Sequence, residues 1–265
     1  MVNRGSETSR WWEFHHDWKE GGGEVIEEIT LTIYVNGVEF ISIMGTPLNQ
    51  DWLAVGFLKN EGILSSLDEI SDLKITPEGC CIDVWLNQDV QLPEKMVITS
   101  GCGSGRTRED QADLEVPFEI EGGTTPPIVL NAFANLQTKD SLYARSRGVH
   151  AAGLLDLETG QILQVAEDVG RHNAIDKLQG ACLLKKITTR GRGLLTTGRI
   201  SSEMLRKGAA MGCPLIASRT SPTTAAIELA QEWQITLVGY ARNGKLRVYC
   251  YPERLGWSPA DSTQG

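Results

Sequence analysis

The sequence predicts a mixed α/β protein, α+β overall, made of two lobes. The first part of the chain alternates apolar and polar residues on either side of tight-turn signals, a pattern typical of a sheet built from hairpins. After about residue 150 the pattern changes to short apolar strands that alternate with helices, which is typical of a layered α/β lobe. An acidic stretch with several glycines and prolines, residues 110–127, separates the two patterns and is interpreted as the linker.

Length and charge limit the kinds of partner. A chain of 265 residues exceeds the usual size of one hydrophobic core, and 41% apolar with 22% charged residues is ordinary for a soluble globular protein. The formal net charge of −9 argues against general attraction to nucleic acid or to a membrane of anionic lipid. A phosphate-bearing ligand would therefore need a local basic pocket.

The cysteines favour a reducing compartment. Six cysteines in a chain of this length do not form the pattern of a small disulfide scaffold: Cys80, Cys81, Cys102, Cys182, Cys213 and Cys250. No secretory signal and no run of ~18 apolar residues is present, so the expected location is the cytoplasm. Cys80 and Cys81 are adjacent, and on a strand their side chains would point to opposite faces.

Residues 1–24 are predicted to be a flexible tail. They contain three tryptophans and the pair His15–His16, and they end in three glycines, residues 21–23, which read as a flexible joint. The histidine pair could bind a metal only with further ligands, so a mobile or loosely docked tail is the preferred interpretation.

Residues 25–125 are predicted to form a small α+β lobe. Asn36–Gly37 separates two alternating runs within residues 25–44, which is the strongest short hairpin signal. Thr46–Pro47 is interpreted as the cap of a helix that ends near Gly62. Short strands are expected at residues 73–75, 82–86 and 96–99, and together these elements indicate an antiparallel sheet.

Residues 126–258 are predicted to form the α/β lobe, followed by a tail at residues 259–265. Helices are expected at residues 128–138, 170–183, 202–211 and 223–233. Strands are expected at residues 151–157, 162–166, 194–197, 215–218 and 235–239, and a last hairpin is expected at residues 238–251.

The loop around Cys102 is the first candidate site. Gly101 and Gly103 flank the cysteine and remove the Cβ atoms that would shield its thiol, while Arg106 and Arg108 follow closely. Nearby cations favour the thiolate and lower a cysteine pKa from its usual ~8.5. A surface loop that happens to carry a cysteine has the same features, so the loop alone leaves both interpretations open.

Further candidates follow the strands of the second lobe, where open α/β sheets bind ligands. His172 could act as a base or ligand donor with Asp168 orienting it, but a helix cap and a histidine on a helix face explain both equally well. The turns at residues 198–202 and 218–224 carry Ser and Thr hydroxyls that suit an anion or simply cap helices, and each turn contains an arginine.

The last hairpin offers an aromatic ring and two cations around a tight turn. Tyr240 could stack on a base, and Arg242 and Lys245 could pair with phosphates. The turn itself, Asn243–Gly244, is sufficiently explained by hairpin geometry.

These segments resemble the formate dehydrogenase accessory sulfurtransferase family (FdhD). The specific stretch is Glu-Asp-Val-Gly-Arg-His-Asn-Ala-Ile-Asp-Lys at residues 167–177. The other matching segments are residues 100–103, 148–152, 197–204, 217–223 and 239–245, and together they cover nearly all of residues 25–256.

The resemblance implies a fold and a function. The second lobe would have the three-layer cytidine-deaminase-like fold, and the protein would be a homodimer. A cysteine desulfurase would place a persulfide on Cys102, which would pass the sulfur to the molybdenum of the bound bis-molybdopterin guanine dinucleotide cofactor. Formate dehydrogenase, the client, needs that sulfur, and no permanently bound metal is expected. The implied cofactor-binding residues are Tyr240, Ala241, Arg242, Asn243, Gly244 and Lys245, with Arg219 as an addition.

Two departures and two rival functions remain. The family usually has Cys-Gly-X-Cys where this chain has Cys102-Gly103-Ser104-Gly105, so a relay would have to use one thiol, and Arg147 stands where glycine is more common. A zinc deaminase would need His-X-Glu and Pro-Cys-X-X-Cys motifs, which the chain lacks. A non-enzymatic carrier or chaperone of the molybdenum cofactor, with Cys102 not catalytic, is the alternative that stays open.

Overall fold

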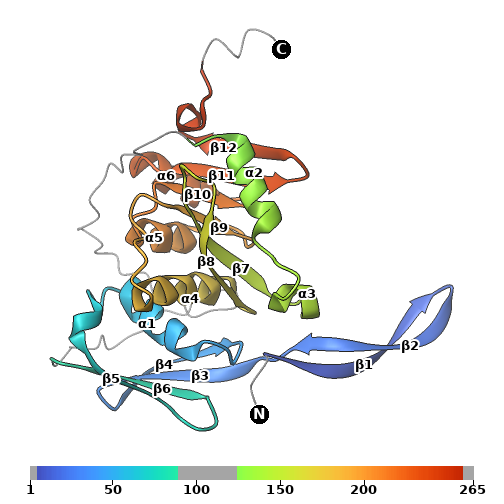
Figure 1. Ribbon diagram of the computed structural model, residues 1–265, viewed down its shortest axis with the longest axis vertical. Helices are drawn as coiled ribbons and strands as arrows, with labels where there is room; N and C mark the ends of the chain where they lie inside the picture. Colours follow the sequence, from blue (N-terminus) through green and yellow to red (C-terminus); the bar gives the residue numbers. More distant parts are fainter. Residues whose placement is uncertain (1–4, 89–123, 259–265) are drawn as a thin grey trace.

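The computed structural model describes residues 5–88 and 124–258, which form two sheet-containing lobes and a projecting hairpin (Figure 1). The hairpin and the first lobe contain β1 (Ser6–His15), β2 (Asp17–Ile26), β3 (Ile29–Val35), β4 (Val38–Gly45), α1 (Gln50–Asn60), the 3-10 turn η1 (Leu67–Glu69), β5 (Ile70–Ile75) and β6 (Cys81–Leu86). The second lobe contains α2 (Pro126–Asn135), α3 (Leu142–Ser146), β7 (His150–Leu155), β8 (Ile162–Asp168), α4 (Arg171–Leu184), β9 (Gly193–Thr196), α5 (Ser202–Ala210), β10 (Leu215–Ser218), α6 (Thr224–Glu232), β11 (Thr236–Arg242), β12 (Lys245–Cys250) and the 3-10 turn η2 (Pro252–Leu255).

The N-terminal segment, predicted to be a flexible tail, is a two-stranded hairpin, and the prediction that residues 21–23 form a joint was wrong because they lie inside β2. β1 and β2 pair in antiparallel register from Ser6↔Ile26 to His15↔Asp17, and they project from the body as an arm (Figure 1). A Cβ atom on Gly21 would lie 2.7 Å from the indole Nε1 of Trp11, and one on Gly23 would lie 2.9 Å from the same ring. The glycines are therefore strand residues that make room for the Trp11 ring, an arrangement known to stabilise glycines in strands.

The sheet of the first lobe has the order β4-β3-β6-β5, and α1 covers one face. The predicted hairpin is confirmed: Asn36 and Gly37 have φ angles of 51° and 77°, as a type I′ turn requires. The prediction of a wholly antiparallel sheet was wrong, because β3 pairs with β6 in parallel. That pairing is available because α1 lies between the two strands in the chain and crosses over the sheet.

The second lobe is a three-layer α/β structure, as predicted. Its six-stranded sheet has the order β12-β11-β10-β9-β7-β8, with β9, β10 and β11 parallel to each other. Neighbouring residues of a strand face opposite layers, so Leu195 packs with α2 while Leu194 packs with α4, α5 and α6. The short helix α3 was not predicted.

The two lobes meet where α1 crosses α4, between the two sheets (Figure 1). The crossing point is formed by Gly56 of α1 and Gly180 of α4. A Cβ atom on Gly180 would lie 2.8 Å from the backbone nitrogen of Gly56 and would overlap the carbonyl oxygen of Trp52. The absence of side chains at these two positions lets the helix backbones touch.

Buried polar groups also join the lobes. Lys177 of α4 is fully buried, and its Nζ lies 2.6 Å from Asp168 Oδ2 and donates to the carbonyl oxygen of Thr46. The Asp168 carboxylate also accepts from the backbone N–H of Thr46, and the Thr46 hydroxyl accepts from that of Val169. Thr46 therefore connects the lobes instead of capping α1, which begins at Gln50 after Asn49.

Several predicted features lie outside the described residues. These are the strand at residues 96–99, the Cys102 loop, most of the linker and the tail at residues 259–265. Among the helices of residues 5–88 and 124–258, none has the length and apolar character needed to cross a bilayer.

Candidate ligand pocket

A cavity of about 830 Å³ opens at the edge of the second lobe's sheet. It lies beyond the carboxyl ends of the parallel strands β9, β10 and β11, where open α/β sheets place their ligands. β7 runs antiparallel to β9, so its first residue, His150, reaches the same edge. The lining residues are Leu130, Asn131, Phe133, Ala134, Gln137, Tyr143, Val149, His150, Thr197, Arg219, Thr220, Ala241, Arg242, Asn243 and Gly244.

The lining is basic although the protein is acidic. It contains two arginines, Arg219 and Arg242, and no aspartate or glutamate, while the whole chain carries a formal net charge of −9. The cavity is also within the size range of pockets for small molecules and cofactors, roughly 300–1,000 Å³. A phosphate-bearing ligand of an acidic protein needs a local basic pocket of this kind.

The β11–β12 turn forms one wall. Asn243 and Gly244 have φ angles of 54° and 71°, so the turn is tight, and the exposed Arg242 reaches the cavity beside it. Tyr240 and Lys245 do not line the cavity. The Tyr240 ring instead contacts Arg247, whose Cζ lies 4.3 Å from the ring centroid, while the Cζ of Arg242 lies 5.8 Å from it.

Arg219 holds the opposite wall in place. Its guanidinium donates to Gln137 Oε1 at 2.9 Å and to the carbonyl oxygen of Phe133 at 3.1 Å. Both acceptors lie at or just beyond the end of α2, so Arg219 fixes that helix against the turn that follows β10. Part of its hydrogen-bonding capacity is therefore used within the protein.

His150 and Thr197 lie on the floor of the cavity and were not assigned to it from the sequence. His150 Nδ1 is 3.4 Å from the Thr197 hydroxyl oxygen, which also accepts from the backbone N–H of Ala151 at 3.0 Å. Burial, and then the nearby Arg171, lower the pKa of His150. The imidazole is therefore neutral at pH 7 and can both donate and accept a hydrogen bond.

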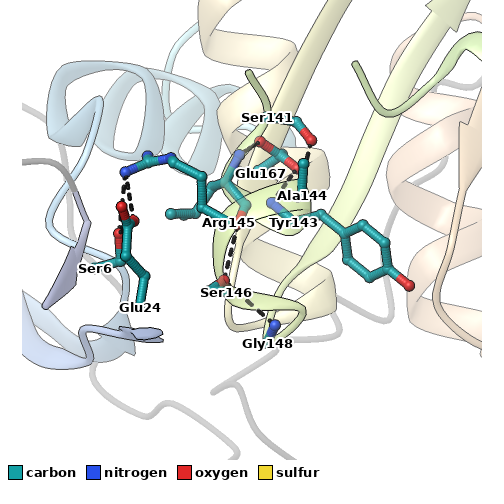
Figure 2. A network of polar contacts seen from close by, with 10 residues as sticks. Ser6, Glu24, Ser141, Tyr143, Ala144, Arg145, Ser146, Gly148 and Glu167 are labelled. Carbon is teal, nitrogen blue, oxygen red and sulfur yellow. Dashed lines mark hydrogen bonds and ion pairs between the residues drawn. The ribbon is translucent and has the colours of Figure 1, made fainter. Parts of the chain in front are cut away.

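Tyr143 is positioned by the capping of α3 (Figure 2). Glu167 accepts from the backbone N–H groups of Leu142 and Tyr143, at 2.7 and 3.1 Å, and Ser141 accepts from that of Ala144. On the other side of α3, Arg145 donates to Glu24 Oε2 and Ser6 Oγ at the base of the arm. One short helix therefore connects the arm to the rim of the cavity.

The other candidates from the sequence have structural roles. Asp168 accepts from the Gly170 N–H at the start of α4 and pairs with Lys177, and His172 is buried with its Nε2 3.3 Å from Glu203 Oε2. Ser201 and Thr223 cap α5 and α6. No group of three metal-ligating side chains occurs within residues 5–88 and 124–258.

Five of the seven predicted cofactor-binding residues line the cavity. They are Arg219, Ala241, Arg242, Asn243 and Gly244. Cys102 and Gly105 lie outside the described residues. The wall formed by α2 was not predicted, because that helix precedes the strands in the chain and reaches the site only through tertiary packing. The signal for His150 and Thr197 was their position next to strand ends.

Comparison with known proteins identifies the family. The FdhD/NarQ family profile matches residues 26–256. This chain belongs to the FdhD/NarQ family. Relatives named "Sulfur carrier protein FdhD" include one from Staphylococcus aureus (strain MRSA252), 38% identical over 238 residues, or 88% of this chain and 89% of the relative. Another, from Staphylococcus haemolyticus (strain JCSC1435), is 37% identical over 236 residues, or 87% of this chain and 89% of the relative.

The fold agrees with the family assignment. A crystal structure described as a formate dehydrogenase accessory protein from Desulfotalea psychrophila superimposes with a TM-score of 0.76. It is 27% identical in sequence and covers 94% of this chain and 99% of its own. Both lobes and the cavity lie within residues 26–256, which the family profile matches, whereas the arm formed by β1 and β2 lies before that match except for Ile26.

Proposed function

We propose that this protein is a sulfur carrier for the maturation of formate dehydrogenase. It accepts sulfur as a persulfide on Cys102 from a cysteine desulfurase and gives it to the molybdenum of a bound bis-molybdopterin guanine dinucleotide. The protein would work in the cytoplasm as a homodimer. The observation that carries the proposal is the basic cavity of an acidic protein, whose wall is the segment that resemblance assigns to the cofactor.

The sulfur transfer balances in two steps. The Cys102 thiolate attacks the outer sulfur of the donor persulfide; a new S–S bond forms, the donor's S–S bond breaks, and the donor cysteine leaves as a thiolate. The outer sulfur then passes to the molybdenum, the Cys102 thiolate is released, and the neutral sulfur atom oxidises the metal by two electrons. Because position 105 is glycine, both steps use a single loop thiol.

The cavity's part is to hold a nucleotide end of the cofactor. Arg242 supplies the charge for a phosphate, and the Asn243–Gly244 turn lets a ligand approach the backbone closely. Neutral His150, Thr197 and Asn131 offer hydrogen-bonding groups of the kind that a guanine or ribose needs. Leu130 and Phe133 supply the apolar surface.

A calorimetric titration of GDP, representing one nucleotide end, tests the pocket with a matched pair of variants. Arg242 and Lys245 are exposed cations three residues apart on one hairpin, but only Arg242 lines the cavity. A charge-assisted hydrogen bond contributes ~1.5–3 kcal/mol, so Arg242→Ala should weaken GDP binding roughly 10- to 150-fold. Lys245→Ala should change it little. Equal affinities of wild type and Arg242→Ala would move the site elsewhere.

A second experiment distinguishes the sulfur relay from the alternative, a carrier or chaperone of the cofactor in which Cys102 is not catalytic. Mass spectrometry after incubation with a desulfurase and cysteine should show an added sulfur on Cys102, and Cys102→Ala should abolish client activation in cells lacking the native protein. Arg242→Ala should still accept the sulfur. Normal activation by Cys102→Ala together with wild-type GDP binding would favour the alternative.

A further inference from the structure

Two thiols lie side by side at the edge of the first lobe. Cys80 immediately precedes β6 and Cys81 is its first residue, and their sulfur atoms are 3.7 Å apart. Both side chains are half-buried, so small molecules reach them. The opposite orientation expected for two neighbouring strand residues does not apply, because only Cys81 belongs to β6.

The turn between β5 and β6 brings the sulfurs together. Thr76 and Cys81 are linked by two hydrogen bonds: the Thr76 N–H donates to the Cys81 carbonyl oxygen at 3.0 Å, and the Cys81 N–H donates to Thr76 Oγ1 at 3.3 Å. Gly79, with a φ of 74°, closes the turn, and its carbonyl oxygen accepts from Gln50 at the start of α1. The position of Cys80 is therefore fixed by its surroundings.

We propose that Cys80 and Cys81 form a reversible vicinal disulfide by exchange with a low-molecular-weight disulfide such as oxidised glutathione. The Cys80 thiolate attacks one sulfur of the glutathione disulfide, which gives a mixed disulfide and one glutathione thiolate. The Cys81 sulfur then attacks the Cys80 sulfur, the mixed disulfide bond breaks and the second glutathione leaves as a thiolate. The proton of Cys81 passes to solvent or to that thiolate. The two protein thiols are oxidised and one glutathione disulfide is reduced.

Local electrostatics support this order of attack. Burial, followed by the hydrogen bond with Cys80, raises the pKa of the Cys81 thiol. The raised pKa makes the Cys81 thiol a poor first nucleophile at neutral pH, so Cys81 is assigned the second, intramolecular step. The buried cysteines do not compete, because burial raises the pKa of Cys182 to about 12 and that of Cys250 to about 11.

The geometry makes the bond labile. Adjacent Cα atoms are ~3.8 Å apart across a trans peptide, whereas the Cα atoms of a disulfide are usually ~4.4–6.8 Å apart. A strained disulfide is more oxidising and is readily reduced, which suits a reversible modification better than a structural crosslink. The strain would be felt in β3, because the Thr32 N–H donates to the Cys80 carbonyl oxygen at 2.8 Å.

The test uses the full chain with Cys102→Ala, so that the loop thiol takes no part. Trypsin cleaves after Lys74 and Lys95 and releases residues 75–95, which contain Cys80 and Cys81 and no other cysteine. After incubation with oxidised glutathione, this peptide should lack two hydrogen atoms and carry no glutathione, and dithiothreitol should restore its mass. Amide exchange at Thr32 should become faster in the oxidised protein.

Two matched variants make the result decisive. Cys80→Ser should react far more slowly with oxidised glutathione, because burial, the largest cause of the raised pKa of Cys81, remains in this variant. Cys81→Ser should stop at a stable glutathione adduct on Cys80. Serine differs from cysteine by one atom at these half-buried positions, so both variants should fold. A parent protein that stays unmodified, keeps glutathione attached, or links either cysteine to another one would overturn the proposal.

Discussion

Replacing Gly180 by alanine should destabilise the protein, although the same change in an exposed helix would stabilise it. Alanine is favoured over glycine inside a helix by ~1 kcal/mol. At this position the new Cβ atom would lie 2.7 Å from the carbonyl carbon of Trp52, closer than real Cβ atoms come to any neighbour. The neighbour is backbone, so no side chain can turn aside, and α1 and α4 must move apart.

The size of the effect follows from these two opposing contributions. Overpacking costs up to ~3 kcal/mol at rigid sites, and subtracting ~1 kcal/mol of helix propensity leaves a loss of about 2 kcal/mol. For a chain of this size that lowers the melting temperature by roughly 4–8 °C, which scanning calorimetry measures directly.

Gly191→Ala is the control: it replaces glycine by alanine at a position where the new methyl group meets no neighbouring atom. Nothing lies within 4 Å of a Cβ atom there, but φ is +77°, so only left-handed backbone strain of ~1–2 kcal/mol applies. The reasoning about helix contact is refuted if Gly180→Ala melts at or above the wild-type temperature.

Three further outcomes are expected. Lys177→Met leaves the buried Asp168 carboxylate without its cation and should cost ~3–5 kcal/mol of unfolding free energy in urea titrations, whereas a loss below 1 kcal/mol would contradict the pairing. Burial lowers the pKa of His150 in the folded protein. As the pH falls, the unfolded chain therefore binds a proton at this histidine at a higher pH than the folded protein does, and the free energy of unfolding should decrease below pH ~6.5. His150→Gln should reduce this decrease in stability at low pH. If the variant shows the same dependence of unfolding free energy on pH as the wild type, His150 is not the group responsible. Trp11→Ala should speed amide exchange in residues 6–26 without moving the global melting temperature, since within the described residues the arm is held at its base by α3; a shift in the global melting temperature would contradict this.

Local chemistry made much of the fold predictable. Asn36–Gly37 adopts the turn that its residue types favour, and the alternation of strands and helices after residue 150 predicted the layered α/β lobe. The parallel pairing of β3 with β6 was missed, because alternation of apolar residues identifies a strand but not its neighbour. The arm was missed for a related reason: glycines usually signal flexibility, and the contact of Trp11 with Gly21 crosses between strands.

The part of the candidate site that one continuous segment forms could be assigned before the structure was known. Arg242 to Gly244 are consecutive, were assigned to the cofactor by resemblance to the family and line the cavity, whereas Lys245, which pairs with Arg242 across the turn, does not line it. Phe133, His150 and Thr197 come from three separate elements and meet only after the sheet has formed. The closeness of Cys80 and Cys81 likewise depends on where β6 begins.

The arm also determines how the molecule moves through solution. Its strands of ten residues extend roughly 33 Å at ~3.3 Å per residue, while α3 holds only the base (Figure 2). Friction depends on the longest dimension more than on mass, so the 29.0 kDa chain should sediment more slowly than a sphere of equal mass. Removing residues 6–26 would take away about a twelfth of the residues and make the chain more compact, so the frictional ratio measured by sedimentation velocity should fall.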